Sequence, residues 1–211
     1  MFRALMDPGR FITFEGIEGS GKSTQIRMLQ ELLVERGHTV RLLREPGGTP
    51  TGDRIRAILL DSSLTELTDT AEMLLFAASR AQLIREEVRP ALAAGDTVLC
   101  DRFVYSSLAY QAHARGLGRD LVWTANMPAL EGILPDRVVL LDLPPDTALQ
   151  RASARAELDR IEAESLSFHK AVRAGFLAEA AADPHRFCVV EATGSPEDIH
   201  KRILEGLGGL L

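Results

Sequence analysis

The stretch Gly16-Ile17-Glu18-Gly19-Ser20-Gly21-Lys22-Ser23 follows the apolar run Phe11-Ile12-Thr13-Phe14 and fits the phosphate-loop pattern, in which two glycines spaced five apart precede Lys-Ser. A strand, a glycine-rich turn and a helix in this order direct main-chain N–H groups and the positive end of a helix dipole at one anion. Lys22 would reach the terminal phosphates, and the hydroxyl of Ser23 would help to hold Mg²⁺. The alternative is a glycine-rich turn that precedes a helix by chance, and the agreement of pattern, strand and helix argues against it.

The composition is that of an ordinary globular chain. Of 211 residues 45% are hydrophobic, so we expect one domain over residues 1–211. The 24 basic and 30 acidic side chains give a net charge of −6, which opposes binding to nucleic acid or to an anionic membrane. There is no apolar run of bilayer-spanning length and no long apolar segment at the start, so we expect a cytoplasmic location. Cys100 and Cys188 lie in apolar runs, which favours buried thiols over a disulfide or a metal site.

Short apolar runs alternate with longer segments of helical period, which predicts an α/β fold with a five-stranded parallel sheet flanked by helices. The predicted strands cover residues 10–14, 39–44, 97–100, 137–141 and 186–190. The predicted helices cover residues 23–36, 51–60, 70–94 with a break expected before Pro90, 106–114, 120–130, 146–155, 165–182 and 195–206. Ligands of such sheets bind at the carboxyl ends of the strands, so functional residues are expected directly after each strand.

A carboxylate follows two of the predicted strands. Asp101 and Arg102 come after the third strand, and Asp142 comes after the fourth. Mg²⁺ takes one or two protein carboxylates beside nucleotide phosphates, so either aspartate suits it. We favour Asp101 because Arg102 gives its loop an anion-binding group. The alternative for Asp142 is a carboxylate at the N-terminus of the next helix.

The loop after the second strand, residues 44–50, contains two adjacent glycines that permit a tight bend, and it leads into a helix that carries Arg54 and Arg56. The forked donors of an arginine match phosphate oxygens, so a second phosphate could bind here. Taken alone, either arginine is better explained by solvation at the surface.

Three further segments carry candidate binding groups. Phe76 and Arg80 stand four residues apart on one helix, so a planar base could stack on the ring and be hydrogen-bonded by the guanidinium, although Phe76 alone is more often a core residue. The residues Ser106-Ser107 and Tyr110-Gln111 offer hydroxyl and amide groups to a base or a sugar, or they cap a helix. Residues 149–160 are charged and weakly amphipathic, as in a lid that brings arginines over phosphates; a solvated helix is the alternative.

Together these residues resemble the thymidylate kinase family of the bacterial type. The resemblance is carried, in this order, by FEGIEGSGKST, REPGGTP, FAASRAQ, DRFVYSSLAYQ and ARAELDRIEAES. It implies the P-loop nucleoside monophosphate kinase architecture with a lid at about residues 150–163. It further implies transfer of the γ-phosphoryl group of ATP to dTMP with Mg²⁺, in the synthesis of dTTP, by a cytoplasmic homodimer.

The resemblance also implies roles for single residues. Lys22, Asp101, Arg102 and the lid arginine Arg155 would be catalytic, and Ser23 and Asp101 would hold the metal. The donor nucleotide would bind to Gly16, Ile17, Glu18, Gly19, Ser20, Gly21, Lys22, Ser23, Thr24 and Arg151.

For the acceptor nucleotide, the resemblance implies that Phe76 stacks on thymine and that Arg80 bonds its carbonyl edge. Tyr110 would crowd the 2′ position of the sugar. The remaining implied contacts are Arg56 and Arg102 with the phosphate, and Ser106, Ser107 or Gln111 near the base.

The chain departs from the family pattern at several positions. Phe103 stands where a tyrosine is usual, and Ser153 replaces a common lid arginine. Gln111 is followed by Ala-His-Ala-Arg rather than a glycine-rich turn, and we interpret His113 as a lone exposed histidine. Two other functions stay open at this point. Another nucleoside monophosphate kinase is the nearer one, and a nucleotide-dependent ATPase switch is the more distant one.

Overall fold

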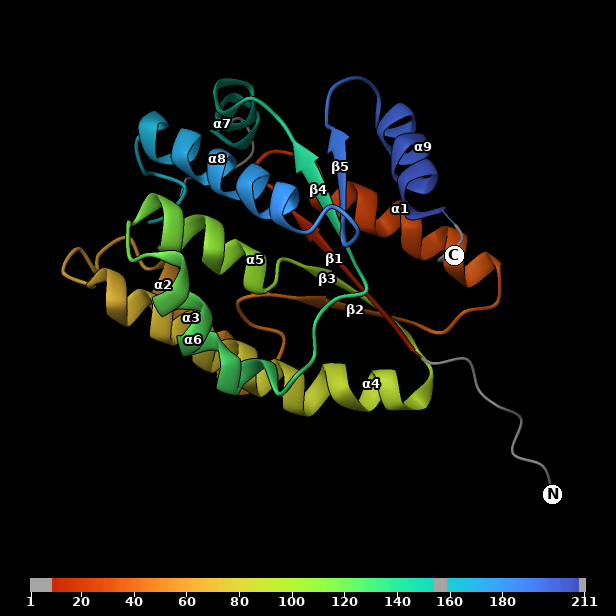
Figure 1. Cartoon of the computed structure of the whole chain (residues 1–211), viewed down its shortest axis with the longest axis horizontal. Helices are drawn as coiled ribbons and strands as arrows, with labels where there is room; N and C mark the ends of the chain where they lie inside the picture. The colour runs from red at the N-terminus through yellow and green to blue at the C-terminus, as the bar shows by residue number, and fades with distance from the viewer. Residues whose placement is uncertain (1–8, 154–158, 209–211) are drawn as a thin grey trace.

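The computed structural model describes residues 9–153 and 159–208, and these form a parallel five-stranded sheet in the order β2-β3-β1-β4-β5 (Figure 1). The strands are β1 (Arg10–Glu15), β2 (Val40–Arg44), β3 (Thr97–Asp101), β4 (Arg137–Asp142) and β5 (Phe187–Glu191). The predicted fold class is confirmed, and each predicted strand agrees with the observed one to within a residue at either end. Short continuous apolar runs locate such strands well, because a parallel sheet is covered on both faces.

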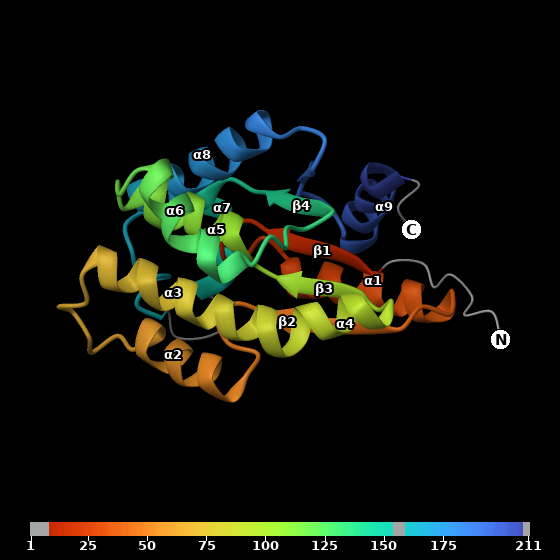
Figure 2. The same ribbon diagram turned by 60° about the horizontal axis from the view of Figure 1, so that its bottom comes forward.

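Helices cover both faces of this sheet. On one face α1 (Lys22–Glu35) packs against α9 (Pro196–Leu207). The other face carries α3 (Asp69–Leu83), α4 (Arg89–Ala94), α5 (Val104–Ser107), the π-helical segment η2 (Leu108–Ala114) and α8 (Leu166–Ala182), as Figure 2 shows from a second side. The remaining helices are α2 (Pro50–Leu60), α6 (Arg119–Leu130) and α7 (Pro145–Ser153). No helix in the described ranges is long and apolar enough to cross a membrane.

The break predicted before Pro90 is not observed. The backbone passes from α3 through the π-helical turn η1 (Ile84–Val88) into α4, where Pro90 stands in the first turn. Proline has no N–H for an i→i−4 bond and its ring crowds the preceding turn, and a wider turn relieves both effects without ending the helix.

The core lies between the sheet and its helices. In β1 every residue from Phe11 to Glu15 is buried, whereas the edge strand β2 is only partly covered. Cys100 and Cys188 are buried free thiols, as the sequence predicted, and burial raises the pKa of both.

The register of β1 and β3 brings two loops together. Phe14 lies opposite Asp101, so the loop that follows β1 and the loop that follows β3 leave the sheet side by side. Arg44, the last residue of β2, also lies opposite Asp101. The residues after three strands therefore share one edge of the sheet, where the sequence places a functional site.

A buried carboxylate joins the first two of these loops. Glu15, fully buried at the end of β1, accepts hydrogen bonds from the N–H of Phe103 at 2.8 Å and from the hydroxyl of Ser106 at 2.6 Å. Directly before Phe103, Arg102 adopts a left-handed φ of 69°, which is uncommon for a residue with a side chain. Burial raises the pKa of Glu15 to about 7, while Ser106, Arg102 and Phe103 act in the opposite direction.

The raised pKa of Glu15 predicts a pH-dependent stability. Between its ordinary pKa near 4.5 and its folded value of about 7, the folded chain holds a proton that the unfolded chain has lost. The free energy of unfolding therefore falls as pH rises through this window. Glu15→Gln removes the titration, so the stability of the variant relative to the parent should rise by up to about 3 kcal/mol from pH 4.5 to pH 8. Urea unfolding at several pH values measures this difference. The other carboxylates contribute equally to the free energy of unfolding of both proteins, so their contributions cancel in the difference between variant and parent. A difference that does not vary with pH would contradict the prediction.

Candidate active site

Lys22 holds the phosphate loop in its bent form. The ammonium group of Lys22 donates to the main-chain oxygens of Gly16 and Ile17, both at 3.1 Å. A Cβ on Gly19 would lie 2.2 Å from the main-chain oxygen of Ala148, so only glycine fits there. The first turn of α1 contains no acidic side chain, which leaves its positive end available to an anion. Residues of the loop and of the start of α1 line a small cavity of about 240 Å³: Glu18, Gly19, Gly21, Lys22, Ser23 and Thr24.

A larger cavity of about 630 Å³, called the main cavity below, adjoins the loop at Glu18. Side chains from the predicted acceptor set come together in its wall: Arg56, Phe76, Arg102, Ser106, Ser107, Tyr110 and Gln111. Five other lining residues come from segments that the sequence predicts to be functional: Glu45 and Pro46 from the loop at residues 44–50, and Asp159, Ile161 and Glu162 from the lid at about residues 150–163. Leu60 and His169 complete the lining and were not predicted from the sequence.

Glu18 stands between the two cations that connect the phosphate loop with the main cavity. One carboxylate oxygen, Oε2, lies 2.7 Å from Nη2 of Arg102 and 3.8 Å from Nζ of Lys22. The charge of Lys22, and next that of Arg102, holds the pKa of Glu18 far below its usual range. Lys22 and Arg102 thus converge on a single negative group at the junction of the two cavities.

Arg102 is fixed from several sides. Its Nη1 donates to the main-chain oxygen of Gly16 at 2.9 Å and to the hydroxyl of Ser106 at 3.2 Å. Its guanidinium carbon lies 5.2 Å from the centre of the Tyr110 ring, within the range of a cation–π contact. Burial raises the pKa of Tyr110 to about 12, so the phenol is neutral at physiological pH.

The other predicted acceptor residues differ in how they meet the main cavity. Phe76 is half-buried and lines it, and Arg56 lines it while donating to the main-chain oxygen of Pro46 at 3.0 Å. Arg80 is only 1% exposed and lies behind the wall. It donates to Glu45 at 2.6 and 2.9 Å, and to Ser107 and Asn126.

Asp101 and Asp142, the two candidates for a metal ligand, have different surroundings. Asp142 binds Arg173 with both carboxylate oxygens, at 2.6 and 2.8 Å, and this ion pair takes the place of the helix-terminal role considered for it. Asp101 shares a cavity with Ser23, and its Oδ1 is buried with no hydrogen-bond partner in the described part of the chain. A buried carboxylate oxygen beside a hydroxyl fits a hard cation such as Mg²⁺. Within the described ranges no cluster of three or more His, Cys, Asp or Glu residues could hold a metal.

The predicted lid arginines are placed only in part. Arg155 lies outside the described residues. Arg151 lies in the last turn of α7, with its Nη1 3.5 Å from the main-chain oxygen of Ala192. His113 is exposed but not alone, because its Nε2 lies 3.6 Å from Oε1 of Glu179.

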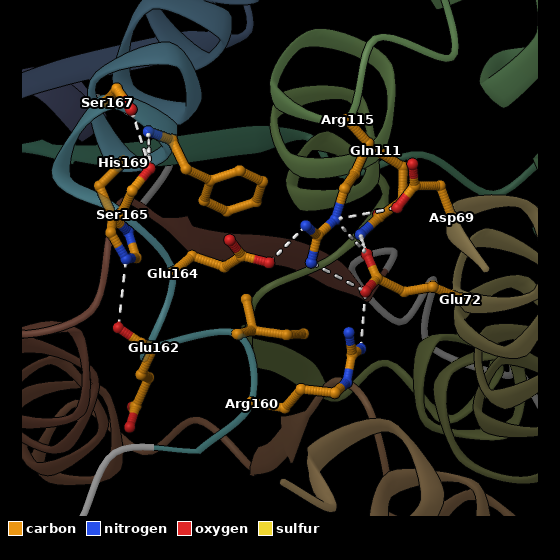
Figure 3. Close-up of polar contacts among 12 residues, drawn as sticks. Asp69, Glu72, Gln111, Arg115, Arg160, Glu162, Glu164, Ser165, Ser167 and His169 are labelled. Carbon is orange, nitrogen blue, oxygen red and sulfur yellow. Dashed lines mark hydrogen bonds and ion pairs between the residues drawn. The ribbon is translucent and has the colours of Figure 1, made fainter. Parts of the chain in front are cut away.

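Glu72, a buried carboxylate of α3, was not predicted from the sequence. It accepts hydrogen bonds from Gln111 at 2.8 Å, Arg115 at 3.2 Å and Arg160 at 2.6 Å, as Figure 3 shows. A signal was available, since Glu72 stands four residues before Phe76 and eight before Arg80 on one face of the helix.

Comparison with known proteins identifies the family of the chain. The thymidylate kinase family model matches residues 14–203. The thymidylate kinase of Deinococcus radiodurans is 51% identical over 193 residues, which cover 92% of this chain and 93% of the relative. The thymidylate kinase of Trichlorobacter lovleyi is 49% identical over 203 residues, with 93% and 96% covered, and that of Geobacter sulfurreducens is 50% identical over 195 residues, with 90% and 92% covered. The chain therefore belongs to the thymidylate kinase family.

Proposed function

We propose that this enzyme transfers the γ-phosphoryl group of ATP to dTMP and so forms ADP and dTDP. The observation that carries the proposal is the convergence of Lys22 and Arg102 on one negative group, Glu18, between the phosphate loop and the main cavity. Two phosphate-binding places that meet in this way suit transfer from a donor on the loop to an acceptor in the cavity.

Charge neutralisation is the main task of such a site. The second pKa of a phosphate monoester is about 6, so at neutral pH the acceptor oxygen is already deprotonated and needs no general base. The obstacle is the repulsion between two polyanions that must approach in line. Lys22 would offset the charge of the donor, and Arg102 and Arg56 would offset that of the acceptor.

The main cavity suits a nucleoside monophosphate. Phe76 offers a ring on which the base would stack, and Ser107 and Gln111 lie in the same wall to meet the base edge. Arg80 lies behind that wall and donates to Glu45, Ser107 and Asn126, so its bond to a carbonyl of the base would require one of these contacts to be exchanged. Tyr110, which packs on Arg102, would exclude a 2′-hydroxyl and so favour deoxyribose.

The lid arginines complete the proposal. Arg155, with Arg151 beside the donor, would bring positive charge to the transferred group. Arg160 is a poorer candidate, because its Nε donates to the main-chain oxygen of Leu59 and its Nη2 to Glu72. Residues 1–211 would act as one domain with a lid at about 150–163, in the cytoplasm.

A panel of nucleoside monophosphates tests the function. With ATP and Mg²⁺, we expect release of ADP to depend on dTMP and to be far slower with AMP, GMP or dCMP, because their base edges carry different donors and acceptors. A coupled assay of ADP release measures this, with the phosphorylated product identified by chromatography. Preference for another monophosphate would assign the chain a different acceptor. If ATP were hydrolysed at the same rate whether or not any of these nucleotides was present, the result would support a switch ATPase.

Mg²⁺ would be held by Asp101 and Ser23, and when bound it would neutralise charge on the donor phosphates. Asp101→Asn should therefore raise the Mg²⁺ concentration needed for half-maximal activity by about tenfold or more, because it removes a charged ligand. Asp142→Asn is the matched control. It should lower stability through Arg173 but leave the Mg²⁺ requirement within about twofold of the parent. Titration of activity with Mg²⁺ measures both, and equal shifts in the two variants would refute the assignment.

A homodimer is also proposed. Leu74 of α3 and Met127 of α6 are 52% and 54% exposed, on two helices that pack against each other. Large apolar side chains exposed on two neighbouring helices favour a covering partner. We expect sedimentation velocity to find a dimer at micromolar concentration, and Leu74→Glu to shift it to monomer. Val34→Glu, at a 54% exposed site on α1, should leave the dimer intact. A monomeric parent protein would disprove this part of the proposal.

A further inference from the structure

The carboxylate of Glu72 is the centre of a buried polar network next to the main cavity. Glu72 itself is not part of the lining, but its partner Gln111 is. Two arginines, Arg115 and Arg160, reach the same carboxylate from other elements of the chain (Figure 3). Glu72 and Gln111 are each 1% exposed, so water competes little for these hydrogen bonds.

Glu72 is ionised in this network. Burial alone would raise its pKa, but the hydrogen bonds from Gln111, Arg160 and Arg115 and the charge of Arg115 lower the pKa below its usual value. An ionised carboxylate has no proton and can only accept hydrogen bonds. Whichever group of Gln111 faces it must therefore be a donor.

This constraint decides the orientation of the Gln111 amide. The amide nitrogen Nε2 lies 2.8 Å from Oε1 of Glu72. The opposite orientation would press the amide oxygen against a carboxylate oxygen, with both groups buried and neither able to donate. The amide oxygen of Gln111 thus lies on the side away from Glu72 and is left as an acceptor, in a residue that lines the main cavity.

We infer that Glu72 is a positioning residue that sets the base specificity of the acceptor site, because it holds the amide of Gln111 with its oxygen toward the base. The inference rests on the proposed placement of the acceptor base in the main cavity. Thymine and uracil present an N–H donor at N3, which matches an amide oxygen. Cytosine presents an unprotonated nitrogen at N3, which would face that oxygen without a proton between them. The network would therefore admit dTMP and reject dCMP.

Glu72→Gln tests this directly. A carboxamide at position 72 can both donate and accept, so the amide of Gln111 is no longer held in one orientation. The ratio of kcat/KM for dTMP to that for dCMP should fall by about 10- to 100-fold. This is the range expected when one unfavourable contact between two acceptors, here that of cytosine N3 with the amide oxygen, is removed. The ratio of dissociation constants of the two nucleotides, measured by calorimetry, should fall in parallel.

A charge swap provides the rescue. In the double variant Glu72→Gln with Gln111→Glu, the amide at position 72 donates to a carboxylate at position 111, which again presents an acceptor to the base. The preference for dTMP should return to within about threefold of the parent. Gln111→Leu, which has no acceptor, should lose the preference, and it serves in place of Glu72→Gln if that variant fails to fold.

Arg160→Met is the matched control. It removes another donor to Glu72 but leaves the contact between Glu72 and Gln111 in place, so it should lower stability without changing the dTMP to dCMP ratio. An unchanged ratio in folded Glu72→Gln, or an equal loss in Arg160→Met, would overturn the inference. Calorimetry separates this result from a failure of the proposed function, because nucleotide preference in binding is measured even where no phosphoryl group is transferred.

Discussion

The site depends on a requirement of electrostatics, that a cation taken out of water must have an anion beside it. Lys22, Arg80 and Arg102 are all largely or fully buried at one edge of the sheet. Glu18 is the counter-ion of Lys22 and Arg102, and Glu45 is the counter-ion of Arg80. The loops after β1, β2 and β3 are held in place by these pairs as much as by the sheet itself.

The two kinds of pair have different consequences for ligand binding. Glu45 and Arg80 are 3% and 1% exposed, so their ion pair is part of the interior and would be costly to break. Glu18 is 40% exposed, and water can solvate it if an incoming phosphate takes over its two cations. An exposed carboxylate such as Glu18 can release its cations to an incoming phosphate at low cost. A buried carboxylate such as Glu45 keeps its arginine in place while this exchange occurs.

The sequence was sufficient for the sheet and for most of the cavity lining, because both follow from short-range patterns. Apolar runs locate the buried strands, and the residues directly after them, such as Arg102, lie at the shared edge whatever the details of the helices. Glu15 and Glu72 were missed for the opposite reason. Glu15 meets Ser106 across 91 positions of sequence, and Glu72 meets Arg160 across 88. Only the packed structure shows that such distant groups share a hydrogen bond.

The burial of Arg80 could not be predicted from the sequence either. Spacing on α3 correctly puts it on the face that also carries Phe76, but it does not say how deep each side chain lies. Phe76 reaches the main cavity, whereas Arg80 is withdrawn behind the wall by Glu45, Ser107 and Asn126. How deeply the Arg80 side chain is buried depends on the residues that it binds, and these residues come from three separate segments.

Hydrogen-bond polarity and shape contribute unequally to the choice of a base. A single methyl group in an apolar pocket is worth about 1–3 kcal/mol, which limits how well thymine can be told from uracil by size. A buried acceptor without a donor costs as much or more, and the mismatch leaves an unpaired group on both partners. A cavity whose wall includes a fixed amide oxygen is therefore expected to separate thymine from cytosine more sharply than from uracil. The orientation of that amide is fixed by a carboxylate that does not line the cavity, so the selectivity of the wall depends on charge buried behind it.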